Sequence, residues 1–343
     1  MFSSRVIPTR RVVPVLVLLS MILTGCAGLP PTLLPASFDA RVIFNLTMVT
    51  FGIATVVFVV VEGILIYSAI RFSRRTSEGL PKQVEGNTRL EIAWTLAPAI
   101  VLAIVYVLSI QALRSVAYQP STSSGAGDTS QALHVRVIGH QWWWEFDYPD
   151  LHIVTANEMH VPEGAVVNLD VESVDVIHSY WVPQLGGKID AIPGRVNHTW
   201  FRAAQAGTYH GQCAEFCGVE HADMRLDAVV EMPDRFQAWV EGQQAPVAQM
   251  TGDAAKGEQV FMTGSCVACH TIDGTQALGK VGPNLTHFAS RQVFAGGVLD
   301  NTPQNLAQWL ADPQKVKPGN LMPNLHLTQA QIDELVAFVA SLK

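Results

Sequence analysis

The residues of this sequence with the most evident chemistry lie in one short segment, residues 213–224. The segment has the spacing C-x3-C-x3-H-x2-M, and a further histidine lies upstream in an apolar, strand-like run. Thiolate and thioether sulfurs are soft ligands, and imidazole binds copper as well as zinc. The set favours a pair of copper ions, with both cysteine sulfurs bridging them, one histidine on each, and a methionine and a backbone carbonyl as caps. The expected ligands are His178, Cys213, the carbonyl of Glu215, Cys217, His221 and Met224.

Three other interpretations of this segment stay open from the residues alone. Cys213 and Cys217 could form a disulfide if the segment lies outside the cytoplasm. A zinc site with two cysteines and two histidines is a second alternative, although zinc would leave Met224 without a role. Met224 could also fill a gap in the core.

A second motif, Cys-Val-Ala-Cys-His at residues 266–270, has the C-x-x-C-H spacing of covalent heme c attachment. Both thiols would bond to the porphyrin, and the histidine would bind the iron. Methionine is the usual sixth ligand and raises the reduction potential, with His287 and His326 as alternatives. A redox-active C-x-x-C would not need the adjacent histidine. The expected heme-binding residues are Cys266, Cys269, His270 and Met322.

The N-terminal residues predict export to the outer side of a membrane. Residues 1–25 combine three arginines, a short apolar run and a small-residue cleavage site, as in a signal peptide. Cys26 follows directly, which predicts a bacterial lipoprotein, and an unlipidated Cys26 in an ordinary signal or short anchor is the alternative. The formal net charge of −7 and the lack of a basic run argue against a nucleic-acid partner.

Residues 26–118 predict a transmembrane hairpin with helices at about 42–70 and 92–113. Each apolar stretch is long enough to cross roughly 30 Å of hydrocarbon. The loop between them carries five basic residues, so the positive-inside rule puts it in the cytoplasm and both ends of the hairpin outside. Two helices bury little of each other, so a larger membrane partner is expected.

The part of the chain that must position the metal ligands is residues 131–240, which follow a linker rich in serine and glycine. Short β-type runs separated by turn residues predict an all-β sandwich. Residues 141–148 are the densest aromatic stretch, and alternation along a strand predicts that part of it forms an exposed interaction patch. Core or membrane-interface packing is the alternative.

Residues 252–343 predict a small all-α cytochrome around the C-x-x-C-H motif. Thr328 with Gln331 forms a capping box, and Thr302 precedes a proline at a helix start. Residues 243–251 are interpreted as a linker, which would keep the cytochrome near the copper site at millimolar effective concentration.

Residues 40–240 resemble subunit II of cytochrome c oxidase throughout. The resemblance rests on the Leu-Glu-Ile-Ala-Trp-Thr-Leu-Ala-Pro run, the Gly-His-Gln-Trp-Trp-Trp segment and the motif with the two cysteines. It implies a cupredoxin domain on a two-helix hairpin, with the dinuclear CuA centre at the residues given above and magnesium at the Glu215 side chain. It further implies that electrons enter at Trp142 and that Glu91 lies at the mouth of a proton channel.

The C-terminal cytochrome resembles the class I domain that some subunits of this kind carry. The resemblance implies a multidomain protein of the bacterial plasma membrane that passes electrons from heme c to CuA and on to subunit I, which reduces dioxygen and pumps protons. Subunit III and a cytochrome c donor would be further partners. Two rival functions remain: the electron-accepting subunit of a CuA-containing nitric oxide reductase, and a membrane-anchored electron carrier without an enzyme partner.

Overall fold

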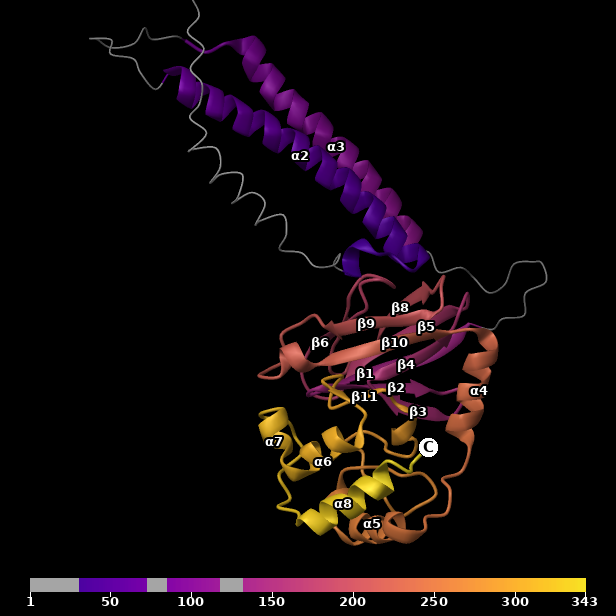
Figure 1. Cartoon of the computed structure of the whole chain (residues 1–343). Coiled ribbons are helices and arrows are strands. Elements are labelled where there is room, and N and C mark those ends of the chain that lie inside the picture. The colour runs from indigo at the N-terminus through magenta and orange to yellow at the C-terminus, as the bar shows by residue number, and fades with distance from the viewer. Residues whose placement is uncertain (1–30, 73–84, 118–131) are drawn as a thin grey trace, which may run out of the picture.

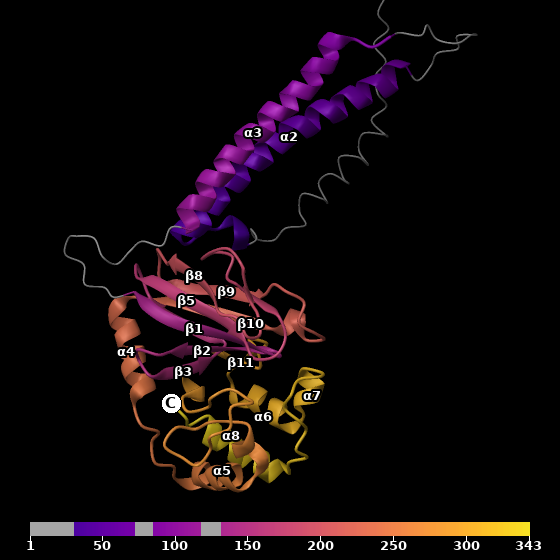
Figure 2. The same cartoon turned by 180° about the vertical axis from the view of Figure 1, so that it is seen from behind.

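The computed structural model describes residues 31–72, 85–117 and 132–343. The predicted signal peptide, Cys26, most of the basic loop and the linker rich in serine and glycine lie outside these residues. The described chain forms a helical hairpin, a β-sandwich and a small helical domain (Figure 1). In two opposite views the sandwich lies between the hairpin and the helical domain (Figure 2).

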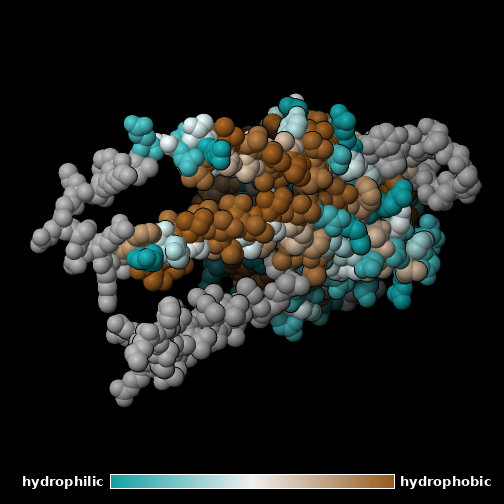
Figure 3. All heavy atoms as spheres, turned by 90° about the horizontal axis from the view of Figure 1, so that it is seen from above, coloured by the Kyte–Doolittle hydropathy of each residue, from teal (hydrophilic) through white to brown (hydrophobic). Residues whose placement is uncertain are grey.

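The hairpin consists of α2 (Phe38–Phe72) and α3 (Thr88–Ala117). Both helices are long and apolar enough to cross a membrane, and each contains an 18-residue stretch with mean hydropathy of 2.5 and 2.3, respectively. At 1.5 Å per residue, α2 is about 52 Å long. Their apolar side chains are exposed along the hairpin, which Figure 3 shows as a brown surface seen from above.

The helices begin earlier than the predicted spans because polar residues outside the apolar stretches cap them. The Ser37 hydroxyl accepts a hydrogen bond from the amide of Ala40 at 3.0 Å. The Asn87 side chain accepts from the amides of Arg89 and Leu90 at 3.1 and 3.3 Å. Such caps satisfy amides that have no partner within the first helical turn.

The hairpin is fastened to the sandwich at the ends of both helices. Before α2, the Ala36 amide donates to the carbonyl of Gln184 at 2.8 Å, and the Ser37 hydroxyl donates to that of Leu185 at 2.6 Å. After α3, the carbonyl of Val116 accepts from the indole of Trp200 at 3.1 Å. These contacts fix where the sandwich stands relative to the membrane helices.

The sandwich contains two five-stranded sheets with orders β3-β2-β1-β5-β8 and β4-β10-β9-β6-β7. Both sheets are mostly antiparallel, but β1 pairs with β5 and β10 with β4 in parallel. The strands of the first sheet are β1 (Leu133–His140), β2 (Trp143–Tyr148), β3 (Ile153–Ala156), β5 (Val166–Ser173) and β8 (Asn197–Arg202). Those of the second are β4 (Glu158–Pro162), β6 (His178–Trp181), β7 (Ile189–Ala191), β9 (Gly207–Cys213) and β10 (Arg225–Glu231).

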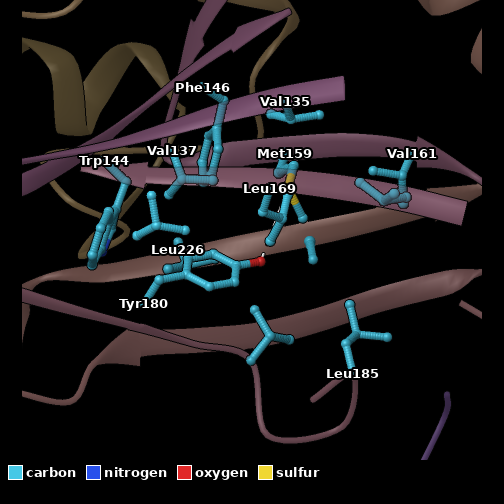
Figure 4. Packing of buried hydrophobic residues seen from close by; sticks show 14 of the residues in the cluster. Val135, Val137, Trp144, Phe146, Met159, Val161, Leu169, Tyr180, Leu185 and Leu226 are labelled. Atoms are coloured by element: carbon cyan, nitrogen blue, oxygen red, sulfur yellow. Dashed lines mark hydrogen bonds between the residues drawn. The ribbon is translucent and has the colours of Figure 1, made fainter. Parts of the chain in front are cut away.

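The space between the sheets holds one apolar core, shown in part in Figure 4. Alternate residues of β5 are buried, as expected of a strand with one face on a core. Trp144, Phe146 and Tyr148 of β2 are completely buried, and full burial stabilises side chains of this size by roughly 2–3 kcal/mol each. Helix α4 (Pro233–Gln244) follows the last strand and covers the sandwich edge.

The C-terminal domain is mostly helical, and its main contact is between α5 (Gly252–Thr263) and α8 (Gln329–Val339). Gly257 allows the two backbones to approach, since a β-carbon there would collide with the carbonyl of Glu334. The capping box at Thr328 is present, and Thr302 caps α6. The remaining elements are η3 (Ser265–Ala268), η4 (Phe288–Ser290), β11 (Val293–Phe294), β12 (Leu299–Asp300), α6 (Pro303–Ala311) and α7 (Pro313–Val316).

Candidate metal centre and heme site

The cysteine loop connects the last two strands of the second sheet, β9 and β10. Cys213 ends β9, and its amide donates to the carbonyl of Met224 at 2.9 Å, which closes the loop at its base. The amide of Ala214 donates to the carbonyl of Ser179 at 2.9 Å, so the loop is joined to β6 as well. His178, the first residue of β6, is therefore held beside a loop that is about 35 residues away in sequence.

The side chains of this loop and His178 converge on one small region. The two cysteine sulfurs lie 3.7 Å apart. The Nδ1 atom of His178 lies 3.9 Å from the Cys213 sulfur, and that of His221 lies 3.6 Å from the Cys217 sulfur. The Met224 sulfur is 3.8 Å from Cys217, and the carbonyl oxygen of Glu215 is 3.2 Å from Cys213. All six predicted ligands are thus brought together, with each histidine on a different sulfur.

His178 is oriented by a carboxylate that the sequence interpretation missed. Its ring is completely buried, and its Nε2 atom lies 2.8 Å from Oδ1 of Asp175. Asp175 is itself held by the amides of Gln141 and Val176, each at 2.6 Å. A carboxylate on one ring nitrogen leaves the other, Nδ1, free to bind a metal. The available sequence signal was the position of Asp175, three residues before the candidate ligand His178.

The pKa values of the two thiols shift in opposite directions. Contact with Cys217 is the main cause that lowers the pKa of Cys213 to about 3, assisted by His178 and backbone amides. Contact with Cys213, together with burial, raises the pKa of Cys217. The pair therefore holds one proton between two sulfurs, and a cation that replaces this proton would allow both to be thiolates.

The geometry bears on the alternatives to copper. A disulfide requires sulfur atoms about 2.05 Å apart, and none joins the cysteines among the residues that the structure describes. Met224 is completely buried with its sulfur turned to Cys217, so a soft thioether belongs to the donor set. Thiolate, imidazole and thioether together fit copper better than zinc, which would use only four of these donors.

The C-x-x-C-H motif lies on the wall of a cavity of about 290 Å³ in the C-terminal domain. Cys266, Cys269 and His270 all line it, and Met322 lines it as well. The two alternative sixth ligands, His287 and His326, do not. Apolar side chains from α5, α6, α8 and the loops between them form much of the remaining wall, as a porphyrin ring requires.

His270 is oriented so that one ring nitrogen remains available. Its Nδ1 atom lies 2.9 Å from the carbonyl oxygen of Pro283, so Nε2 is the ring nitrogen that remains available to a metal. Gly282 lies directly against the ring, since a β-carbon there would be 2.6 Å from Cε1. The Met322 sulfur accepts a hydrogen bond from the Trp309 indole at 3.0 Å.

A buried cation also fits a heme in this cavity. Arg291 lines the wall, is 6% exposed, and has no hydrogen-bond partner for its Nε atom within the described chain. Burial lowers its pKa to about 10, so the guanidinium stays charged at neutral pH. Heme carries two carboxylate side chains, and a buried guanidinium is a suitable partner for them.

The heme cavity extends to the sandwich through the aromatic segment that follows β1. Gln141, Trp142 and Trp143 line it together with Asn157. The prediction of an exposed aromatic patch is wrong, because Trp142 and Trp143 are each only 8% exposed and Trp144 is in the core. The reason is that the C-terminal domain packs on this face, which sequence alternation along a strand cannot foresee.

Trp142 links the two candidate sites. While it lines the heme cavity, its indole N–H donates to the carbonyl of Cys217 at 3.0 Å. The side chain of Gln141 donates to the same carbonyl at 2.7 Å. Gly218 packs on the indole, since a β-carbon there would be 2.8 Å from it.

The two predicted acidic residues lie at the surface. Glu91 is exposed in the first turn of α3, at the end of the hairpin away from the sandwich. Glu215 is exposed in the cysteine loop, with its carbonyl turned inward to Cys213. The fold therefore separates Glu91 from the cysteine loop and leaves both carboxylates open to a neighbouring subunit.

Comparisons with known proteins agree over nearly the whole chain. Family models described as cytochrome c oxidase subunit II match residues 34–112 for the transmembrane domain and 152–232 for the periplasmic domain, and cytochrome c matches 254–343. Cytochrome c oxidase subunit 2 of Alkalihalophilus pseudofirmus is 37% identical and covers 95% of both chains. That of Bacillus subtilis is 34% identical and covers 97% of this chain and 98% of its own.

Among solved structures, the periplasmic domain of subunit II of cytochrome oxidase of Bradyrhizobium japonicum is 38% identical. It covers 34% of this chain and 97% of that domain, with a TM-score of 0.33. The chain belongs to the cytochrome c oxidase subunit II family, in the form that carries a cytochrome c domain after the periplasmic domain.

Proposed function

We propose that this chain is the electron-accepting subunit of a proton-translocating cytochrome c oxidase. It relays electrons from a covalently bound heme c to a dinuclear CuA centre and on to subunit I, where dioxygen is reduced to water and protons are pumped. One observation carries the proposal: Trp142 lines the heme cavity and hydrogen bonds to the backbone of Cys217. The two redox sites are thus joined through a single residue.

The copper centre would be held by His178, His221, both cysteines, Met224 and the Glu215 carbonyl. Bound copper would supply one-electron transfer without change of ligands. The chain contributes a closed loop that keeps these donors in place, with Cys213, Cys217 and Met224 at most 3% exposed. Little water reaches the centre, so small changes of charge there require little solvent reorganisation.

The heme would be attached at Cys266 and Cys269 and its iron would be bound by His270 and Met322. Bound heme would supply the one-electron chemistry of the cytochrome domain. The hydrogen bond from His270 to Pro283 orients the imidazole, and the indole of Trp309 holds the thioether of Met322 in the same cavity. Arg291 would balance the negative charge of the heme carboxylates.

The proposal places the chain in the bacterial plasma membrane, with both redox domains on the outer side and a lipid anchor at Cys26. The exposed apolar faces of α2 and α3 support a membrane partner, which would be subunit I with subunit III. The exposed carboxylate of Glu215 would bind magnesium at the contact with subunit I, and Glu91 would open a proton channel there. Cytochrome c or a related heme protein would be the donor.

The test is the Cys217→Ser variant of the intact complex, studied by metal analysis, electron paramagnetic resonance and oxygen consumption. We expect the dinuclear copper signal and oxygen consumption to be lost, while the heme c spectrum is unchanged because its ligands are all in the other domain. Ser265→Ala, beside the heme-attachment motif, is the matched control and should keep both signals. Zinc in place of copper in the wild type, or loss of both spectra together, would contradict the proposal.

A further inference from the structure

The contact between the cytochrome domain and the cysteine loop depends on glycines that have no room for a side chain. The turn between β11 and β12 reaches the loop, where the amide of Arg225 donates to the carbonyl of Gly296 at 2.8 Å. A β-carbon on Gly296 would lie 2.6 Å from the carbonyl oxygen of Trp142, and one on Gly297 would lie 2.9 Å from Cβ of Arg225. Both glycines also have positive φ, at +76° and +75°, a region that other residues rarely adopt.

A buried lysine of the cytochrome domain lies at the centre of this contact. Lys317 is 2% exposed, and its Nζ atom donates to the carbonyls of Trp142 at 2.8 Å, Asp223 at 2.6 Å and Ala295 at 3.0 Å. An ammonium group has three N–H donors, and all three are used. Two acceptors belong to the sandwich domain and one to the cytochrome domain, so this one group joins both.

The charge on Lys317 persists at neutral pH. Burial lowers its pKa to about 8, and the nearby charges of Glu220 and Asp223 oppose that effect. A buried ammonium group that lost these acceptors would be costly. The three carbonyls therefore have to stay where they are for the lysine to remain buried.

A carboxylate of the sandwich makes the reciprocal contact. Glu158 of β4 is 1% exposed, and its Oε1 atom accepts from the amides of Gln292 and, at 2.7 Å, of Val293. Lys317 of the cytochrome domain thus binds the backbone of the sandwich, and Glu158 of the sandwich binds the backbone of the cytochrome domain. Contacts of this kind fix both position and orientation.

We infer that Lys317 and Glu158 are positioning residues that lock the cytochrome domain onto the cysteine loop with the heme cavity against Trp142. The inference rests on the proposed function, because it concerns how the heme is held relative to the copper ligands. The packed contact, and not the linker of residues 243–251, then keeps the heme cavity close to the copper ligands. Trp142 is closed to a separate soluble cytochrome, so external donors reach the chain only at the cytochrome domain.

The decisive experiment compares Lys317→Met with Lys315→Met in the intact complex. Lys315 is an exposed lysine two residues away and serves as the matched control. Hydrogen exchange is followed in peptides containing Arg225, Gln292 and Val293, whose amides donate across the contact and lose these partners when the domains separate. Loss of the charged hydrogen bonds should speed this exchange about tenfold or more in Lys317→Met. Exchange in β5 should not change, nor should any peptide in Lys315→Met.

A second readout is the rate of electron transfer from heme c to copper after rapid reduction of the heme. In the wild type this rate should not depend on ionic strength, because the contact is buried and permanent. In Lys317→Met it should fall and become dependent on salt, with both absorption spectra unchanged. Adding Glu158→Gln should enlarge both effects. Wild-type exchange and wild-type rates in Lys317→Met would overturn the inference.

Two further outcomes are distinguishable. If Lys317→Met loses heme or copper, Gly296→Ala is the second variant. Its added methyl group should open the same contact by steric collision while every side-chain donor is kept. Unchanged hydrogen exchange in Gly296→Ala would overturn the lock. If the wild type contains no copper, the proposed function fails. The exchange readout does not depend on electron transfer, so it still supports or overturns the lock in that case.

Discussion

Asp175 fixes the Nε2 atom of His178, although nothing about the cysteine motif points to it. Ligand identity follows from residue type, but the direction in which a ligand points depends on its neighbours. The same holds for His270, which the carbonyl of Pro283 orients. At the scale of single residues, such supporting contacts decide whether the donors of each site are ready to bind.

Asp175→Ala should weaken copper binding by about tenfold to a hundredfold, the usual cost of removing a carboxylate behind a ligating histidine. The dissociation constant is measured by competition with a copper chelator. Asp170→Ala is the control, because Asp170 pairs with His134 and His198 away from the loop. Equal affinities of the Asp175 variant and the wild type would show that packing alone orients His178.

Met322→Ala should leave the heme covalently attached but lower its reduction potential. Axial ligands set heme potentials over a range of about 0.8 V, so we expect a shift of tenths of a volt. A spectroelectrochemical titration measures it, with His326→Ala as the control because His326 does not line the cavity. An unchanged potential would leave Met322 as a packing residue only.

At the scale of elements, His160 ties together two strands and a helix. It lies on β4, its ring stacks on Trp239 of α4 at 4.5 Å, and its Nδ1 atom is 3.1 Å from Glu231 of β10. Burial disfavours the charged ring, but hydrogen bonds to Glu158 and Glu231 and their charges outweigh it and raise the pKa of His160. The charged form is therefore more favourable in the folded state than in the unfolded one.

The sign of the pH dependence follows from that raised pKa. The stabilisation is fully present below about pH 6.5, the ordinary value for histidine, and is lost as pH rises through the raised pKa. Removing the ring in His160→Asn should therefore cost roughly 1 kcal/mol more at pH 6 than at pH 9. Thermal unfolding of the wild type and the variant at both pH values measures it, with the exposed His210→Asn as control. A difference of opposite sign would contradict the assignment.

How much the sequence predicts depends on whether the interacting residues are contiguous. The cysteine motif, the C-x-x-C-H motif, the apolar helices and the capping box at Thr328 are local patterns, and their structures follow from spacing and propensity. The interdomain contacts of Lys317 and Glu158 join residues more than 90 positions apart. No periodicity encodes such pairs, so the sequence predicted a tethered cytochrome and an exposed aromatic patch where the structure has a packed contact.

At the scale of the whole molecule, the three parts follow one another from the membrane outward: the hairpin, the sandwich and the cytochrome domain (Figure 1). The sandwich is fixed to the hairpin at Ser37 and Trp200, and the cytochrome domain is fixed to the sandwich at Lys317 and Glu158. Under the proposed function, an electron that reaches the outermost domain would meet an ordered series of sites with no step that requires free diffusion.

Trp142→Gln should slow electron transfer from heme c to copper without changing either absorption spectrum, because the indole lies between the two sites. Stopped-flow reduction of the purified complex measures the rate. Trp142→Phe keeps an aromatic ring but loses the hydrogen bond to Cys217, so comparison of the two variants separates the ring from the bond. Wild-type kinetics in Trp142→Gln would assign this residue to packing.

The shared wall of the heme cavity has a consequence for biogenesis. Gln141, Trp142 and Trp143 of the sandwich line the space that the proposed porphyrin would occupy. Under the proposed function, we expect porphyrin ligation to come first and the cytochrome domain to pack on the sandwich afterwards.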